Sequence, residues 1–177
     1  MKNILLLVSL LSVAMATNIS GAFCSEKKLK PSDAIVDVFT KEFPTNEKEL
    51  EGFLFYTFAP LIEDGRFRGA TVEAWEERYE QFANSLIQKS ESNMLDSKSL
   101  EKCLKKVLKD AKELNEAYLP IAAYSAKKDQ KPVWIIVVGW EGTDVENVPP
   151  YKLLLSHIKV FVYDVTTIEL VGYTTCM

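Results

Sequence analysis

Apolar side chains recur at helical spacing through the middle of the chain. The clearest stripe follows Thr71, with intervals of four, three and four residues between Trp75, Tyr79, Phe82 and Leu86. A second helix is expected to begin at Asp96 or Ser97, with an inward face of Leu100, Cys103, Leu104, Val107, Ala111 and Leu114. Such spacing gathers side chains on one face because an α-helix turns by about 100° per residue. Both segments are therefore predicted to be amphipathic helices.

The segment before Thr71 also shows helical spacing, but less clearly. Ser32 or Asp33 can cap a short helix whose apolar positions would be Ile35, Val38, Phe39 and Phe43, with Pro44 just beyond it. Asn46 and Glu49 have the spacing of a capping box and predict another helix, with Leu50, Phe53, Leu54, Phe58 and Leu61 on one face. Residues 53–58 are also compatible with a strand.

After Pro120 the pattern changes from helices to strands. Short apolar segments at 121–126, 133–140, 153–163 and 168–175 are separated by polar turns at 127–131 and 164–167 and by an acidic loop at 141–150. The segment 133–140 is apolar at both alternating positions, which is typical of a central strand covered on both sides. Short connections between successive strands favour an antiparallel meander. The sequence thus predicts an α+β fold, with a helical N-terminal half packed on a C-terminal sheet of about four strands.

The first 22 residues have the layout of a secretory signal peptide. Lys2 precedes an apolar run at 4–13, and small residues follow at 14–16 and 20–22. Cleavage after Ala22 is preferred to cleavage after Ala16 and would leave a single domain at 23–177, secreted or periplasmic. Bulky Phe23 argues against a lipid anchor on Cys24. No later segment reaches the roughly 20 apolar residues of a membrane span, so no transmembrane anchor is expected after cleavage.

The charge of the chain argues against nucleic acid as its main partner. The net charge is -4, whereas domains that bind nucleic acid are usually basic. One predicted helix nevertheless carries a lysine stripe, formed by Lys98, Lys102, Lys105, Lys109 and Lys112. This stripe has two interpretations, contact with an anionic lipid or envelope polymer, or a solvated helix face. The glycine loops that hold phosphates are absent from the sequence, and no cofactor is expected.

Candidate catalytic chemistry is sparse. His157 is the only histidine, which excludes metal sites and catalysis that need two histidines. A hydrolase acting on envelope material, with His157 working beside a carboxylate or a cysteine, remains the alternative to a binding function. No catalytic or metal-binding residue is predicted from a motif. Export makes a disulfide between two of the three cysteines an expectation, with Cys103–Cys176 preferred and Cys24–Cys176 left open.

The strand half is rich in aromatic residues that alternate with aliphatic ones. Simple alternation places on one sheet face, beside Lys159, the residues Trp134, Trp140, His157, Phe161, Tyr163 and Tyr173. Mixed aromatic and polar surfaces suit ligand or partner binding. The other interpretation is that helices cover this face and make it part of the core.

Part of the strand half resembles PepSY-type, cystatin-like domains, which are exported bacterial modules. The resemblance rests on residues 132–135, 157–164 and 169–171 and on a final turn that in this family reads Asp-x-x-Thr-Gly-Glu. Asp164, Thr167 and Glu169 match this turn, and Ile168 stands in place of the glycine. The resemblance implies a helix packed on an antiparallel sheet and a binding, inhibitory or folding-assistance role. The expected function is therefore an exported, non-enzymatic binding or accessory domain for an unknown protein or envelope ligand.

Overall fold

The computed structural model describes residues 30–39, 52, 70–71, 75–142, 152–153 and 157–176. A short 3-10 helix, η1 (Pro31–Asp33), leads into β1 (Ile35–Val38), and β2 (Ala70–Thr71) precedes α2 (Trp75–Ser92) and α3 (Ser97–Glu113). The remaining elements are strands, namely β3 (Glu116–Lys128), β4 (Lys131–Gly142), β5 (Lys152–Leu153), β6 (His157–Asp164) and β7 (Leu170–Cys176). The predicted signal peptide, Cys24 and the capping box at Asn46 lie outside the described residues.

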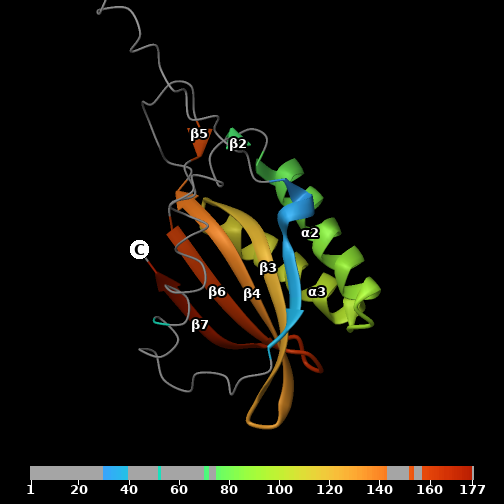
Figure 1. The fold of residues 1–177 in the computed structure, drawn as a ribbon. Coiled ribbons are helices and arrows are strands. Elements are labelled where there is room, and N and C mark those ends of the chain that lie inside the picture. Colours follow the sequence, from blue (N-terminus) through green and yellow to red (C-terminus); the bar gives the residue numbers. More distant parts are fainter. Residues whose placement is uncertain are drawn as a thin grey trace, which may run out of the picture.

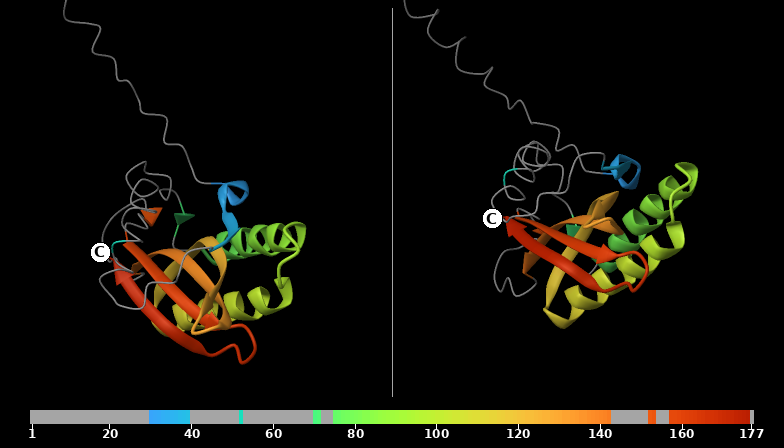
Figure 2. Two further views of the ribbon diagram at one scale, coloured as in Figure 1. Left: turned by 60° about the horizontal axis from the view of Figure 1, so that its bottom comes forward. Right: turned by 90° about the horizontal axis from the view of Figure 1, so that it is seen from below.

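Five of the strands form one sheet in the order β1-β3-β4-β6-β7, and β2 pairs with β5 separately. From β3 to β7 every neighbouring pair is antiparallel, whereas β1 runs parallel to β3. Helices α2 and α3 lie side by side against one face of this sheet (Figures 1 and 2). The α+β class and the antiparallel meander of the strand half are therefore confirmed.

The predicted position of the helices and the number of strands are wrong. The two long helices lie in the middle of the chain, after β1, and the main sheet has five strands and is mixed. At Ile35–Val38, where the spacing predicted a short helix, the chain forms β1 and pairs with residues 122–125 of β3. Isoleucine and valine favour extended backbone, and the partner strand supplies the hydrogen bonds that decide the conformation.

The two amphipathic helices fold as their spacing indicates. On α3 the predicted inward residues are buried from Leu100 to Ala111, and Leu114 is exposed because the helix has ended at Glu113. Asp96 caps the helix by accepting a hydrogen bond from the Ser99 backbone N–H at 3.1 Å. Asn115 follows with a φ of 52°, which is a common way to end a helix and here turns the chain into β3.

The connections between the strands depend on residues in left-handed conformation. Asp129 and Gln130 both have positive φ, at 51° and 65°, which fits a two-residue hairpin turn between β3 and β4. After β6, the Asp164 carboxylate accepts hydrogen bonds from the backbone N–H groups of Thr166 and Thr167, at 2.7 and 2.9 Å. Both hydrogen bonds lower the pKa of Asp164, and the bond from Thr167 has the larger effect. Ile168 then adopts a φ of 57°, the conformation that the glycine of the resembled turn would favour.

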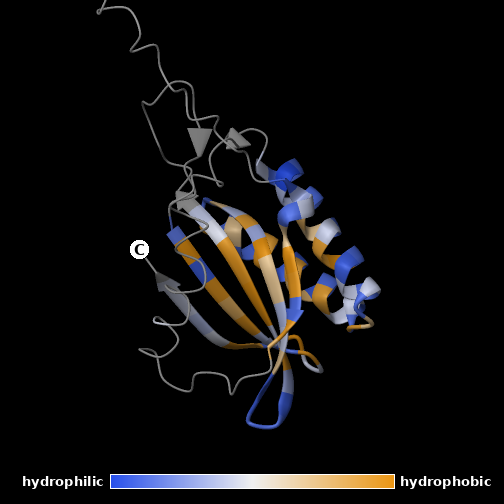
Figure 3. Cartoon of the chain, viewed as in Figure 1, coloured by the Kyte–Doolittle hydropathy of each residue, from blue (hydrophilic) through white to orange (hydrophobic). Residues whose placement is uncertain are grey.

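The core extends over both faces of the central strands. From Val133 to Val138 every side chain of β4 is buried, as is every side chain from Ile158 to Tyr163 of β6. This confirms the expectation that 133–140 forms a central strand. Figure 3 shows hydrophobic positions along the strands and along the inner sides of the two helices. In the described part of the chain, no helix is long and apolar enough to cross a membrane.

Candidate functional site

The register of the sheet places all six predicted aromatic-face residues on one face. Trp134 lies opposite Tyr163, and Trp140 opposite His157. Phe161 lies opposite Tyr173 on β7. Because directly opposed residues project to the same side of an antiparallel pair, these rings share the face on which α3 packs.

One part of this face belongs to the core. Trp134, Phe161 and Tyr163 are at most 3% exposed. The Trp134 indole N–H donates a hydrogen bond of 2.8 Å to Ser99 Oγ in the first turn of α3. Burial, together with the neighbouring Asp110 on the same helix, raises the pKa of the Tyr163 hydroxyl. These three rings are therefore part of the core, as the second interpretation of this face expected.

The other part of the face reaches the surface, and we call its three residues Trp140, His157 and Tyr173 the aromatic end. Trp140 and His157 are half-buried, with ring centroids 5.1 Å apart. Tyr173 on β7 is 49% exposed, and its ring lies 5.4 Å from that of Phe161. Tyr173 thus continues the buried aromatic cluster outward to solvent beside Phe161, and Trp140 and His157 form a second ring pair toward the end of β4 and at the start of β6.

A buried ion pair, Lys159–Glu116, lies beside the aromatic end. Lys159 is 4% exposed, and its ammonium group contacts the Glu116 carboxylate and donates a hydrogen bond of 3.1 Å to the Tyr118 hydroxyl. Tyr118 in turn donates to Glu116. The ammonium nitrogen also lies 3.9 Å from the centroid of the Trp140 ring and 5.0 Å from that of Tyr118. Burial first, and then the hydrogen bond to Glu116, raise the pKa of Tyr118.

Sequence reasoning placed Lys159 on this face but missed Glu116 and Tyr118. The predicted strand began at Ile121, after Pro120, whereas β3 begins at Glu116. The sequence did contain a signal that Glu116 and Tyr118 share a strand face. These two residues are two positions apart, as are Lys159 and Phe161. Period-two spacing puts both members of each pair on one face of a strand. The β-bulge near Pro120 accommodates the proline and allows β3 to run through it.

Within the described part of the chain, two polar atoms at the aromatic end are buried and have no hydrogen-bond partner. They are Nε1 of Trp140 and Nδ1 of His157. An unpaired buried polar group costs about 1–3 kcal/mol. Such unpaired groups are uncommon in native structures.

The described residues do not bring His157 together with a catalytic partner. The His157 ring packs against the Trp140 ring, and the Glu116 carboxylate on the same face is already bound to Lys159 and Tyr118. The register pairs Cys176 with Ile158 and not with His157. Within the described ranges, no group of three His, Cys, Asp or Glu residues could hold a metal ion.

Cys103 is a free, buried thiol on α3. The predicted bond to Cys176 thus gains no support. The alternative partner, Cys24, lies outside the described residues. Burial raises the pKa of the Cys103 thiol to about 12.

We expect Cys103 to resist alkylation in the folded protein. The thiolate is the reactive species, and at pH 8 a thiol with this pKa remains protonated as well as buried. Iodoacetamide at pH 8, followed by peptide mapping, should leave the Cys103 peptide unmodified in native protein and modify it fully in denaturant. Rapid labelling in the native state, or a mapped Cys103 disulfide, would contradict this expectation.

The lysine stripe on α3 is exposed and in part neutralised. Lys105 pairs with Glu101 at 2.6 Å and Lys109 with Glu113 at 3.4 Å, both within the helix. Lys112 pairs with Glu76 of α2. Exposed pairs of this kind contribute little to stability, but they reduce the positive potential that an anionic surface would meet. The structure therefore favours the interpretation as a solvated face.

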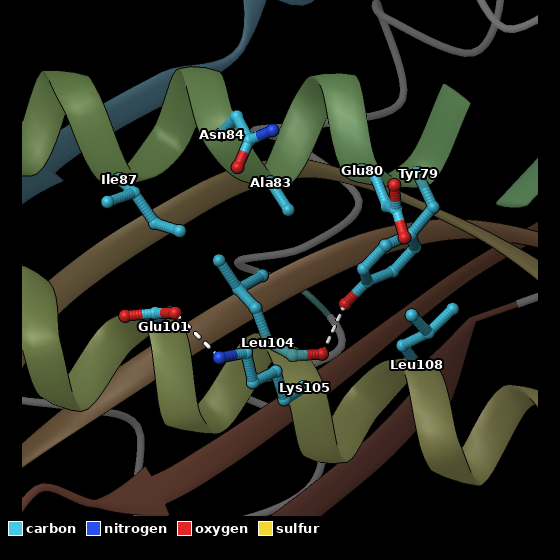
Figure 4. A pocket seen from close by; sticks show the side chains of 9 residues that line it. All are labelled: Tyr79, Glu80, Ala83, Asn84, Ile87, Glu101, Leu104, Lys105 and Leu108. Atoms are coloured by element: carbon cyan, nitrogen blue, oxygen red, sulfur yellow. Dashed lines mark hydrogen bonds and ion pairs between the residues drawn. The ribbon is translucent and has the colours of Figure 1, made fainter. Parts of the chain in front are cut away.

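A hollow of about 230 Å³ lies between α2 and α3 (Figure 4). Tyr79 reaches from α2 to α3 toward one end of the hollow and donates a hydrogen bond of 2.6 Å to the Leu104 carbonyl oxygen. The ion pair between Glu101 and Lys105 forms part of its rim. Burial raises the pKa of Tyr79 well above its usual value, which keeps this hydroxyl protonated as a donor between the two helices. The hollow is thus held by contacts that join the helices to each other.

The chain matches no protein-family model, and neither a curated protein nor a solved structure is similar to it at a significant level. The resemblance to PepSY-type domains thus gains no support from these comparisons and rests on the strand and turn residues alone.

Proposed function

We propose that this chain is an exported, non-enzymatic binding domain whose ligand contacts the aromatic end of the sheet. Export is supported by the signal-like layout of residues 1–22. An accessory role, inhibitory or assisting folding, is supported by the resemblance of the strand half to PepSY-type domains. The lack of a catalytic neighbour around His157 in the described residues favours binding over hydrolysis.

The exposure of Tyr173 carries this proposal. Its ring is 49% exposed although the Phe161 ring lies 5.4 Å away and is itself 3% exposed. A half-exposed ring that rests on buried rings is already ordered before a ligand arrives, so less conformational entropy is lost on binding. Tyrosine and tryptophan are also enriched among the residues that dominate binding energy at interfaces.

The chemistry of the aromatic end indicates what its ligand must offer. The exposed ring of Tyr173 and the half-buried ring of Trp140 suit a flat apolar surface. The indole N–H of Trp140 is buried, so the polar group that a ligand meets is the Tyr173 hydroxyl, which both donates and accepts hydrogen bonds. We therefore propose a protein or envelope component that combines an apolar surface with a polar group able to bind this hydroxyl.

Tyr173→Ala is expected to abolish capture of the ligand while leaving the fold intact. Truncation of a central interface ring costs about 2 kcal/mol or more of binding energy, roughly thirtyfold in affinity, whereas a half-exposed ring contributes little to stability. The immobilised protein should be incubated with solubilised cell envelope, and the bound material identified by mass spectrometry. Thermal melts of the same preparations should show similar midpoints for wild type and variant.

Val38→Ala is the matched control, because Val38 is also 49% exposed but lies on β1 at the opposite edge of the sheet. This variant should capture the same material as wild type. Equal capture by wild type and Tyr173→Ala would refute the aromatic end as the binding surface. A measurable turnover that disappears in His157→Ala, with capture unchanged, would replace the binding domain with the hydrolase.

A further inference from the structure

The two edges of the five-stranded sheet differ in how they are protected. On β1, the Lys89 side chain donates to the Ala34 carbonyl and Asn93 donates to the Val36 carbonyl at 3.2 Å. The Val38 backbone N–H is bound by the Asp37 carboxylate at 2.7 Å. Side chains thus occupy the backbone groups along this edge, which prevents another strand from pairing with it.

Among the described residues, side chains protect the opposite edge, β7, only at one end. Lys128 donates to the Val171 carbonyl at 2.7 Å, at the end of the strand next to the β-bulge. From Gly172 to Cys176, no other described side chain binds the backbone. The strand also contains no charged residue and no proline, which are the usual means of blocking an edge. Its exposed side chains include Leu170, Val171 and Tyr173.

An uncharged strand of this kind matches a second copy of itself. If two β7 strands run antiparallel about Tyr173, no like charges face each other, and the two Tyr173 rings meet as a cross-strand aromatic pair. A two-fold arrangement uses the same surface on both copies and is therefore closed. The protected β1 edge would then prevent the ten-stranded sheet from growing further.

We propose that β7 is a homodimer interface, at which β7 of a second copy pairs antiparallel with it and joins the two sheets. We name another copy of this chain as the partner because β7 carries no charge that could bind a charged peptide. A second β7 strand is equally uncharged and can pair with it without repulsion. The two Tyr173 rings would then meet across the new strand pair, while Trp140 and His157 of the two copies would lie toward its opposite ends.

The mass of the full chain in solution tests this interface. Light scattering over a concentration series should show the wild-type mass rising to twice that of a single chain. Tyr173→Glu should remain monomeric because two carboxylates would face each other at the two-fold axis. Val38→Glu, with the same 49% exposure at the β1 edge, should dimerise like wild type. Melting curves should show that both variants are folded.

Mixing tests the pairing more directly. Tyr173→Glu and Tyr173→Lys chains, each monomeric alone, should form a dimer when combined, because opposite charges then meet. Hydrogen exchange should slow in the amides of residues 172–175 with rising wild-type concentration, and not in those of β1.

A wild-type monomer at every concentration, a mass above the dimer, or a Tyr173→Glu dimer would overturn the proposal. Slow exchange in β7 that requires another protein would overturn it as well. Trp140→Ala, which alters the aromatic end on β4 and leaves β7 unchanged, should lose the ligand and keep the dimer, and so separates the two.

Discussion

Trp134→Ala is expected to lower the free energy of unfolding by about 3–5 kcal/mol, as truncation of a large buried ring does. Trp134 is 1% exposed, and its indole N–H is bonded to Ser99 Oγ at 2.8 Å. Removing the ring leaves a cavity between β4 and the first turn of α3 and a buried hydroxyl without this donor. Chemical denaturation followed by circular dichroism measures the change.

Two variants show whether the loss comes from the ring or from its hydrogen bond. Ser99→Ala removes the acceptor and leaves the ring, so it should cost about 1–3 kcal/mol. Tyr173→Ala removes a ring of the same face that is half exposed, and it should change stability by less than either. If Trp134→Ala were no more destabilising than Tyr173→Ala, Trp134 would not be part of the core and the placement of α3 over it would be wrong.

The difference between Trp134 and Tyr173 shows where sequence reasoning about the site reached its limit. Alternation along the strands correctly placed both on one face, because residues two apart in a strand project to the same side. Whether a ring on that face is covered depends on where α3 lies across the strands. Helix α3 contacts β3 and β4, while β7 forms the edge of the sheet. The sequence does not encode that lateral position in any local pattern.

The helices were predictable because their signals are local. In α3 the cap at Asp96 and the inward residues from Leu100 to Ala111 all lie within the helix itself. The first strand was not predictable in this way. Ile35, Val38 and Phe39 fit helical spacing as well as extended backbone, and β1 exists through its pairing with residues 122–125, far along the chain. Non-local pairing of this kind overrides the preference of a short segment.

Glu116→Leu is expected to destabilise the protein by about 3 kcal/mol, because it leaves the Lys159 ammonium buried without its counter-charge. Lys159 would retain the Tyr118 hydroxyl and the faces of Trp140 and Tyr118. Those contacts do not replace a carboxylate that both carries the opposite charge and orients the Tyr118 hydroxyl. Denaturant unfolding at neutral pH measures the loss.

The double variant Glu116→Leu/Lys159→Met decides what the ion pair contributes. Replacing both partners of a buried pair by apolar residues of similar volume is often neutral or stabilising, whereas removing one partner is costly. We therefore expect the double variant to be more stable than Glu116→Leu and close to wild type. Since Lys159 lies against the Trp140 ring, at 3.9 Å from its centroid, the same protein also tests whether the charge is needed at the aromatic end. Wild-type stability with lost ligand capture would show that the buried pair serves binding, and a double variant as unstable as Glu116→Leu would show that the pair is required for packing.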